Sequence, residues 1–327
     1  MKFKESEARC HRWGVILAGG DGERLLPLTR RIAGDDRPKQ FCAIIGKETL
    51  LHETQRRIAR LVPRLRTLLV LTRTHEVFYA DELAATSPSR LLIQPSNRGT
   101  APAILFSLMR LCDMDPKGTV AFFPSDHHFS NNEAFINHVD SAYAAAASRP
   151  EVVILLGITP ETPEVQYGWI EPGTPLGVPV RDFVCRVSRF WEKPSRPLAA
   201  DLMARGCLWN SFVMVGQVHA FVKLLRHALP GLVGRFESIR SSLFRMSERT
   251  ALGELYSSIR AASFSQDVLS VYPQDLAVLR GRDLGWSDLG EPNRVLSILD
   301  RKGVQPEWRV KAGCGDGLVA VREKAAG

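Results

Sequence analysis

Short runs of consecutive apolar residues recur along the first half of this chain, separated by stretches with helical spacing. Such runs indicate strands that are buried on both faces, because a strand exposed on one face would alternate apolar and polar residues. Strands that alternate with helices form a mostly parallel sheet with helices on both faces. We therefore predict an α/β, Rossmann-like fold. The expected strands are 13–18, 67–72, 90–95, 118–126 and 151–158, and the expected helices are about 49–62, 75–86 and 100–112.

The alternation becomes less regular from about residue 160 onward. A helix is expected to begin at Ser130, because Ser130 and Glu133 have the spacing of a capping box. Neither a Ser/Gly-rich linker nor an internal repeat divides the sequence, so we expect one elaborated domain. It is expected to span residues 1–290, in halves of about 1–150 and 151–290, with a C-terminal tail at 291–327. The second half should hold strands at 167–173, 184–194 and 206–216 and helices near 195–205 and 217–260.

Composition excludes several classes of protein. The chain has 327 residues, of which 45% are hydrophobic and 24% are charged, as is usual for a globular protein. Its apolar runs fall short of the ~18–20 residues that a membrane helix needs. The charged N-terminus lacks the apolar segment of a secretory signal. We therefore expect a cytoplasmic protein without a membrane partner.

The cysteine spacing and the net charge further limit which disulfides, metal sites and ligands we expect. No two cysteines form a C-x-x-C pair, which favours reduced, mostly buried thiols over disulfides or a zinc site. The net charge of +8 suits either nucleic acid or small phosphorylated ligands. Because the basic residues are scattered and form no tail or stripe, we expect no nucleic-acid partner. The six cysteines are Cys10, Cys42, Cys112, Cys185, Cys207 and Cys314.

Three glycines, Gly19, Gly20 and Gly22, closely follow the first expected strand, and Arg24 comes two residues later. Glycines can adopt positive φ and let an anion approach successive backbone N–H groups, and an arginine can add a bidentate phosphate contact. A tight turn would account for one or two of these glycines, but it would not account for three glycines followed by an arginine. The G-x-G-x-x-G pattern fails because Leu25 stands at its third glycine, and the G-K-[ST] ending of the P-loop is missing. We predict a phosphate-binding loop of another kind.

This loop and several later segments resemble the sugar-1-phosphate nucleotidyltransferases, in particular the mannose-1-phosphate guanylyltransferases. In that family the pattern L-A-G-G-x-G-x-R-L-x-P-L leads to P-K-Q-F. The resemblance extends over most of the chain, and the motifs are specific in combination although each alone is weak. The matching segments are LAGGDGERLLPLTR (17–30), RPKQF (37–41), QPSNRGTAPAI (94–104), FPSDHHF (123–129), YGWI (167–170), FWEKPS (190–195), LWNSF (208–212) and GWSDLG (285–290).

The resemblance implies that an oxygen of a sugar 1-phosphate attacks the α-phosphorus of an NTP and expels pyrophosphate. Two polyanions must meet, so the site needs positive charge and a metal ion. The family motifs imply that Arg24 and the glycine amides hold the NTP phosphates, and that Lys39 neutralises charge where the two phosphates meet. They also imply that Asp126 and Asp288 bind Mg²⁺. These four residues are the predicted catalytic set.

Each member of the set also has a simpler structural explanation. Lys39 would then be a solvated surface lysine, Asp126 a helix cap and Asp288 part of an Asx turn. The motifs favour the catalytic roles. We expect His127 and His128 to form local hydrogen bonds and not to bind the metal, since Mg²⁺ avoids imidazole.

The resemblance also implies which residues contact the nucleotide. Gln94 is a candidate for hydrogen bonds to the base edge. Thr100 can contact the base or ribose, but it can equally be an ordinary N-cap. The residues expected to bind nucleotide are Leu17, Ala18, Gly19, Gly20, Gly22, Arg24, Gln94, Arg98 and Thr100.

A further group of residues matches the sugar-phosphate side of the family site. Glu192 and Lys193 are adjacent, so both can reach one pocket only if the backbone is irregular there, which Pro194 makes plausible. Tyr167 and Trp169 fit the site or the core equally well. The residues expected to bind the sugar phosphate are Lys39, Gly168, Glu192, Lys193 and Asn210.

Several positions depart from the family pattern. Phe212 replaces the glycine of W-N-S-G, Gly99 replaces the asparagine of R-N-T, and Gln94 replaces a common glutamate. These changes bear on the choice of base and sugar more than on the phosphate and metal roles.

The sequence as a whole predicts a Mg²⁺-dependent enzyme that makes GDP-mannose from GTP and mannose 1-phosphate. Another NTP and sugar phosphate, such as UTP or ATP with a glucose or heptose phosphate, is the nearest alternative. A non-catalytic sensor of nucleotide sugars is a second alternative, and a nucleic-acid binder, which rests on the charge alone, is a third. A homodimer is left open as the assembly.

Overall fold

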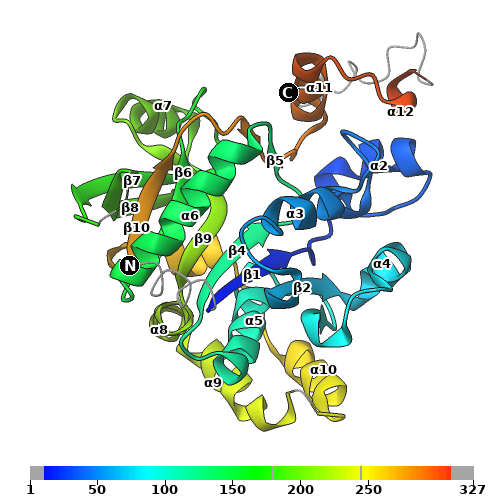
Figure 1. Ribbon diagram of the computed structural model, residues 1–327, viewed down its shortest axis with the longest axis vertical. Helices are drawn as coiled ribbons and strands as arrows, with labels where there is room; N and C mark the ends of the chain where they lie inside the picture. Colours follow the sequence, from blue (N-terminus) through cyan, green and yellow to red (C-terminus); the bar gives the residue numbers. More distant parts are fainter. Residues whose placement is uncertain (1–10, 179, 181, 244, 311–327) are drawn as a thin grey trace.

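The computed structural model describes residues 11–310 except 179, 181 and 244. Nine strands form one sheet in the order β3-β2-β1-β4-β9-β6-β10-β8-β7 (Figure 1). Their bounds are β1 (Arg12–Leu17), β2 (Thr67–Thr72), β3 (Leu91–Gln94), β4 (Thr119–Pro124), β6 (Val153–Ile158), β7 (Gly168–Pro175), β8 (Val184–Glu192), β9 (Leu208–Gln217) and β10 (Leu276–Gly281).

The apolar runs form central strands because both faces of the sheet are covered. Successive side chains of β1 point to opposite faces, so Val15 packs into one core and Ile16 into the other. Four helices cover the face of Ile16: α3 (Leu50–Ile58), α4 (Glu76–Leu83), α6 (Asn132–Ser148) and α7 (Arg196–Ala204). Four others cover the face of Val15: α5 (Thr100–Met114), α8 (Val218–Ala228), α9 (Pro230–Ser238) and α10 (Glu248–Ser258). The predicted α/β fold with helices on both faces is confirmed.

The directions of the strands depart from a simple parallel sheet at two places. β1 is parallel to both β2 and β4, and β6 is parallel to β10. β9 lies between β4 and β6 and is antiparallel to both, and β8 is antiparallel to β7 and β10. A strand from late in the chain therefore joins the two groups of parallel strands.

A third core cluster lies at one end of the molecule (Figure 1). Leu25 and Leu28, beside the glycine loop, pack with Val295 and Leu299 from the segment after residue 290. The helices that contribute are α2 (Leu26–Ala33), α11 (Pro292–Lys302), α12 (Glu307–Val310) and, through Leu50, the start of α3. The division of the chain at residue 290 stays a prediction, and residues 311–327 of the expected tail lie outside the described part.

Short elements complete the fold. A two-stranded antiparallel ribbon pairs β5 (His128–Phe129) with β11 (Trp286–Ser287) and thereby joins two of the family motifs. The five-residue η7 (Ser265–Leu269) is a π-helix. The 3₁₀ turns are η1 (Glu23–Leu25), η2 (Lys39–Phe41), η3 (Arg64–Arg66), η4 (Arg73–His75), η5 (Pro88–Arg90), η6 (Arg240–Ser242) and η8 (Pro273–Asp275).

Three sequence predictions can be checked against these elements. The capping residue of α6 is Asn131, whose side chain accepts a hydrogen bond from the N–H of Ala134, so the predicted helix start at Ser130 is wrong by one residue. Four of the cysteines are free thiols: Cys42, Cys112, Cys185 and Cys207. Cys10 and Cys314 lie outside the described residues. Within the described part of the chain, each helix is too short or too polar to cross a bilayer.

Candidate active site

A cavity of about 510 Å³ opens beyond the carboxyl ends of β1 and β4. It contains all four predicted catalytic residues, Arg24, Lys39, Asp126 and Asp288, which come from four separate segments of the chain. This is the edge at which open α/β sheets bind their ligands. The full lining is Asp21, Gly22, Glu23, Arg24, Leu25, Lys39, Asp126, His127, Asp288 and Gly290.

The three glycines of the loop serve different purposes. Only Gly22 among them uses the positive φ that glycine allows, with a φ of 65°. A Cβ on Gly19 would lie 2.8 Å from both Gln94 Nε2 and Thr72 Oγ1, so Gly19 is required by packing. Gly20 faces open space, where a ligand can approach its backbone.

The loop is held in place by its own backbone bonds and by Gln40. The Gln40 amide donates hydrogen bonds to the carbonyl oxygens of Ala18 (3.1 Å) and Gly20 (2.7 Å). The Ala18 N–H donates to Val70, and the Leu17 carbonyl accepts from Ser125. The backbone groups of Leu17 and Ala18 are thus engaged within the protein. Sequence reasoning overlooked Gln40, although it lies in the P-K-Q-F motif.

Lys39 connects the two aspartate segments. Lys39 is only 8% exposed, so the surface-lysine explanation is wrong. Lys39 Nζ lies 3.2 Å from Asp126 Oδ2 and donates to the carbonyl oxygens of Asp288 (2.7 Å) and Leu289 (3.3 Å). A buried cation therefore stands between the two predicted metal ligands.

The Asp288 carboxylate is held on one side only. Its Oδ1 accepts hydrogen bonds from Tyr167 Oη (3.0 Å), the Gly290 N–H (3.0 Å) and Arg294 (2.7 Å). Burial alone would raise the pKa of Asp288, but Arg294, His127 and Lys39 outweigh burial and lower it. A Cβ on Gly290 would come within 2.4 Å of Asp288 Oδ2, so a glycine there leaves room beside this oxygen.

Arg294 is a member of the site that the sequence analysis missed. It bridges Asp288 and Glu164, the latter at 2.7 Å, and its guanidinium lies 4.6 Å from the centre of the Tyr167 ring. Tyr167 also packs against Trp286 at a ring distance of 4.9 Å, so it belongs to both the core and the site. The one signal for Arg294 in the sequence is its position, six residues after Asp288 and in the first turn of α11.

The two neighbouring histidines face different surroundings. His127 lines the cavity, and its Nδ1 lies 3.2 Å from the Trp286 indole N–H, so the predicted local hydrogen bond is confirmed. Burial lowers the pKa of His127. His128 is 3% exposed, and neither ring nitrogen has a hydrogen-bond partner in the described structure, so the same prediction is wrong for His128.

The donor set of the cavity fits Mg²⁺. The described residues hold no cluster of three or more His, Cys, Asp or Glu side chains that could bind a metal by themselves. Mg²⁺ commonly uses one or two carboxylates and completes its shell with water and substrate phosphates. Asp126 and Asp288 line one cavity and provide two such carboxylates.

Among the expected sugar-phosphate residues, only Lys39 lines this cavity. Lys193 has a φ of 46°, so the predicted irregular backbone is confirmed, and its N–H donates to the Tyr167 carbonyl. Gly168 pairs with Glu192 across β7 and β8. A Cβ on Gly168 would lie 2.7 Å from the Phe190 ring and 3.0 Å from Glu192 Oε2, so protein side chains require this glycine.

The two other polar residues of the predicted sugar-phosphate set, Glu192 and Asn210, have different surroundings. Burial raises the pKa of Glu192. The buried Asn210 side chain accepts a hydrogen bond from the Phe212 N–H at 3.1 Å. Phe212 itself has a φ of 59°, a left-handed conformation that the glycine of the family motif adopts more readily.

The predicted nucleotide segment also lies outside the cavity lining. Gln94 Oε1 accepts from the Tyr256 hydroxyl at 3.0 Å, and Arg98 Nε donates to the Tyr256 carbonyl at 3.0 Å. Thr100 is the first residue of α5, and its hydroxyl accepts from the N–H of Phe264. The N-cap is Gly99, so the alternative of Thr100 as an ordinary N-cap is wrong.

The chain belongs to the nucleotidyl transferase family, whose profile matches residues 13–301. It is 29% identical over 293 residues to the xanthan biosynthesis protein XanB of Xanthomonas campestris, covering 88% of this chain and 60% of XanB. It is 32% identical over 287 residues to a mannose-1-phosphate guanylyltransferase of Sinorhizobium fredii, covering 86% of this chain and 54% of that protein. The chain thus spans little more than half the length of these relatives.

A solved structure has the same fold. It is described as a mannose-1-phosphate geranyltransferase from Thermus thermophilus, and it superposes with a TM-score of 0.75 at 29% identity. The match covers 88% of this chain and 79% of that one.

Proposed function

We propose that this chain is a Mg²⁺-dependent nucleotidyltransferase that converts GTP and mannose 1-phosphate to GDP-mannose and pyrophosphate. The observation that carries the proposal is the single cavity that gathers Arg24, Lys39, Asp126 and Asp288. Membership of the nucleotidyl transferase family supports the reaction class. The similarity to the Sinorhizobium fredii protein named mannose-1-phosphate guanylyltransferase supports the choice of GTP and mannose 1-phosphate as substrates.

The cavity suits two phosphorylated reactants because cations and carboxylates line it together. Arg24 and the open backbone at Gly20 hold the triphosphate. An oxygen of the sugar 1-phosphate forms a bond to the α-phosphorus, the bond from that phosphorus to the bridging oxygen breaks, and pyrophosphate leaves with the bonding electrons. Lys39 stabilises the negative charge that accumulates between the phosphates.

Asp126 and Asp288 would hold Mg²⁺, which supplies positive charge and orientation at the α-phosphate when bound. The surrounding residues prepare Asp288 for this role. Arg294 and Tyr167 occupy Oδ1, and Gly290 leaves space at Oδ2. The lowered pKa of Asp288 keeps the carboxylate ionised.

The other assignments follow from the neighbourhood of the cavity. Leu17 and Ala18 lead into the glycine loop. Gln94 packs against Gly19 of that loop, and this contact supports a role in nucleotide binding for the segment that includes Arg98 and Thr100. We assign the sugar phosphate to the part of the site near Tyr167, because the Lys193 N–H is hydrogen-bonded to the Tyr167 carbonyl there. Gly168, Glu192 and Asn210 complete that side.

Pyrophosphate release tests the reaction. It should be measured for each of four NTPs with mannose, glucose and heptose 1-phosphates, and GTP with mannose 1-phosphate is expected to be fastest. A faster pair would replace the specific assignment but keep the class. Binding of nucleotide sugars without pyrophosphate release from any pair would identify a non-catalytic sensor.

Substitution of a carboxylate tests the metal role. Asp126→Asn should lower kcat roughly 100-fold, because a donor to the metal and its charge are lost. The control is Asp81→Asn, which removes an exposed carboxylate of α4 and should leave kcat unchanged. Chelation should abolish turnover, and added Mg²⁺ should restore it. Undiminished turnover in Asp126→Asn would contradict this role.

A further inference from the structure

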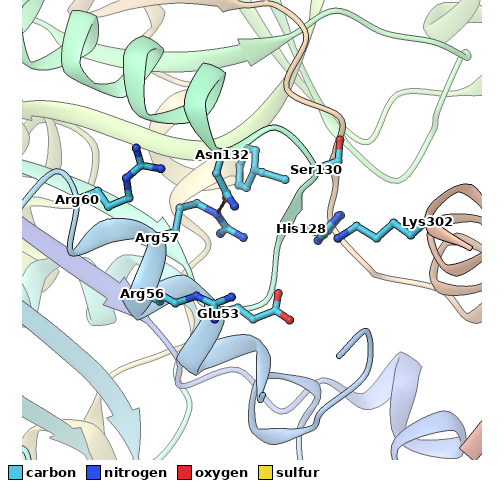
Figure 2. Close-up of a pocket in the computed structure, with 9 residues that line it drawn as sticks. Glu53, Arg56, Arg57, Arg60, His128, Ser130, Asn132 and Lys302 are labelled. Atoms are coloured by element: carbon cyan, nitrogen blue, oxygen red, sulfur yellow. Dashed lines mark hydrogen bonds between the residues drawn. The ribbon is translucent and has the colours of Figure 1, made fainter. Parts of the chain in front are cut away.

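A second cavity, of about 290 Å³, lies between α3, β5 and α11 (Figure 2). Two adjacent residues line different cavities: His127 lines the catalytic cavity, and His128, the first residue of β5, lines the second one. The lining of this second cavity is Glu53, Arg56, Arg57, Arg60, His128, Phe129, Ser130, Asn132 and Lys302.

The second cavity is strongly cationic. Arg56, Arg57 and Arg60 extend from α3 and the turn after it, and Lys302 is the last residue of α11. Glu53 is the one carboxylate in the lining; burial raises its pKa, and the charges of Arg57, Lys302 and Arg56 act in the opposite direction. Four cations therefore face a single acid.

Two of the four cations already have carboxylate partners outside the cavity. Arg56 lies 2.7 Å from Glu48 and Arg60 lies 2.6 Å from Glu133. Both side chains are exposed, so these pairs are weak and can rearrange.

Arg57 and His128 are buried, and no carboxylate of the described residues lies within ion-pair distance of the Arg57 guanidinium, although the charge of Glu53 acts on it. Arg57 is 7% exposed and is in no ion pair with the described residues. Its Nε donates to Asn132 at 2.7 Å, and its guanidinium lies over the Phe129 ring. His128 has no partner for either ring nitrogen in the described structure. Buried cations and buried donors are destabilising unless an anion or acceptor meets them.

The orientation of these side chains is convergent. In Figure 2, Arg57 extends from α3 and Lys302 reaches from α11 toward His128, which is drawn between them. Lys302 is exposed and, like Arg57, is in no ion pair among the described residues. Two cations and an imidazole thus approach one small volume from different elements.

We propose that this cavity is a binding site for a phosphate group, either inorganic phosphate or the phosphate of a small phosphorylated metabolite. The oxygens of a phosphate can accept hydrogen bonds from the Arg57 guanidinium, the Lys302 ammonium and a His128 N–H at the same time. Planar, charged guanidinium groups favour phosphate over a neutral ligand. The size of the cavity limits the ligand to a small molecule.

Location of a phosphate analogue in crystals tests the site directly. Crystals of the full chain soaked in tungstate are expected to show a heavy-atom peak between Arg57, His128 and Lys302. A peak that is confined to the catalytic cavity would overturn the proposal.

Matched variants test the site in solution. Binding of inorganic phosphate and of a hexose 6-phosphate is measured by calorimetry with wild type, Lys302→Gln and Arg301→Gln. The last variant makes the same charge change on the same helix but at a residue that does not line the cavity. The second-site affinity should fall roughly five- to tenfold in Lys302→Gln and clearly less in Arg301→Gln, because the Arg301 charge acts on His128 but the residue does not line the cavity. Equal losses in the two variants would overturn the proposal.

His128→Phe provides an independent test, because it keeps a buried ring but removes both nitrogens. The second-site affinity should fall about tenfold. Unchanged affinity in a folded His128→Phe protein would contradict the site, and Lys302→Gln decides the matter if that variant does not fold. Tighter binding of the hexose 6-phosphate identifies a metabolite as the ligand, and tighter binding of inorganic phosphate identifies the free ion.

Discussion

Gly99 lies at a point of close contact between two distant segments, and substitution there should destabilise the protein strongly. Its φ of 84° and ψ of −178° lie in a region that only glycine readily occupies. A Cβ on Gly99 would lie 2.4 Å from the Ala262 carbonyl oxygen and 3.0 Å from its carbon. This backbone cannot move freely, because the Ala262 N–H donates to Arg98 and its carbonyl accepts from Ala101, both at 3.0 Å.

The expected cost of Gly99→Ala is the sum of two effects. The backbone conformation costs about 1–3 kcal/mol for a residue with a side chain. Displacement of Ala262 weakens one or both hydrogen bonds, at about 1 kcal/mol each. We therefore expect a loss of about 2–5 kcal/mol in the free energy of unfolding. Gly99→Asn, which restores the residue of the family motif, should meet the same carbonyl.

Thermal and urea unfolding, followed by circular dichroism, measure this loss. The matched control is Gly253→Ala in α10, where no atom lies within 4 Å of the added Cβ. That variant should be about 0.5–1 kcal/mol more stable than the wild type, since alanine favours a helix. The reasoning is refuted if Gly99→Ala unfolds within about 0.5 kcal/mol of the wild type, a difference within the range of ordinary surface substitutions.

Four further predictions concern the site and the thiols. Arg294→Gln should lower the free energy of unfolding by about 2–4 kcal/mol, measured by urea titration, because it removes the cation that is hydrogen-bonded to the buried Asp288 carboxylate. Gly22→Ala should raise the KM for the NTP in steady-state assays, since its φ of 65° shapes the loop and Lys39 N lies 3.2 Å from the added Cβ; an unchanged KM would contradict this. Burial raises the pKa of Cys42 and Cys207 from 9.0 to about 11, so iodoacetamide at pH 8 should modify them only after unfolding, as mass spectrometry would show. For the same reason stability should fall as the pH rises above 9, where the unfolded thiols ionise first.

The first half of the fold could be predicted because its signals are local. The apolar run at 67–72 is β2, residue for residue, and the run at 151–158 contains β6. The place of β9 could not be predicted in this way. Its sequence indicates a strand, but only the folded chain shows that it inserts between β4 and β6, because pairing depends on contacts between distant segments.

The site shows the same division between local and distant information. Family motifs pointed to Lys39, and the structure buries it beside Asp126. The bonds of Lys39 to the 288–289 backbone cross about three quarters of the chain and leave no periodic pattern. Arg294 was missed because its contacts also join distant segments. The free ring nitrogens of His128 were missed because the absence of a hydrogen-bond partner leaves no pattern in the sequence.

The insertion of β9 has a consequence for dividing this protein into fragments. β4 carries the wholly buried Phe122, and one of its two edges is covered only by residues that follow position 200. A fragment that ends near residue 150 would leave that edge bare, with unpaired N–H and carbonyl groups along a strongly apolar strand. Such a fragment would pair with copies of itself and precipitate, so neither half should be expected to survive as a soluble piece without the other.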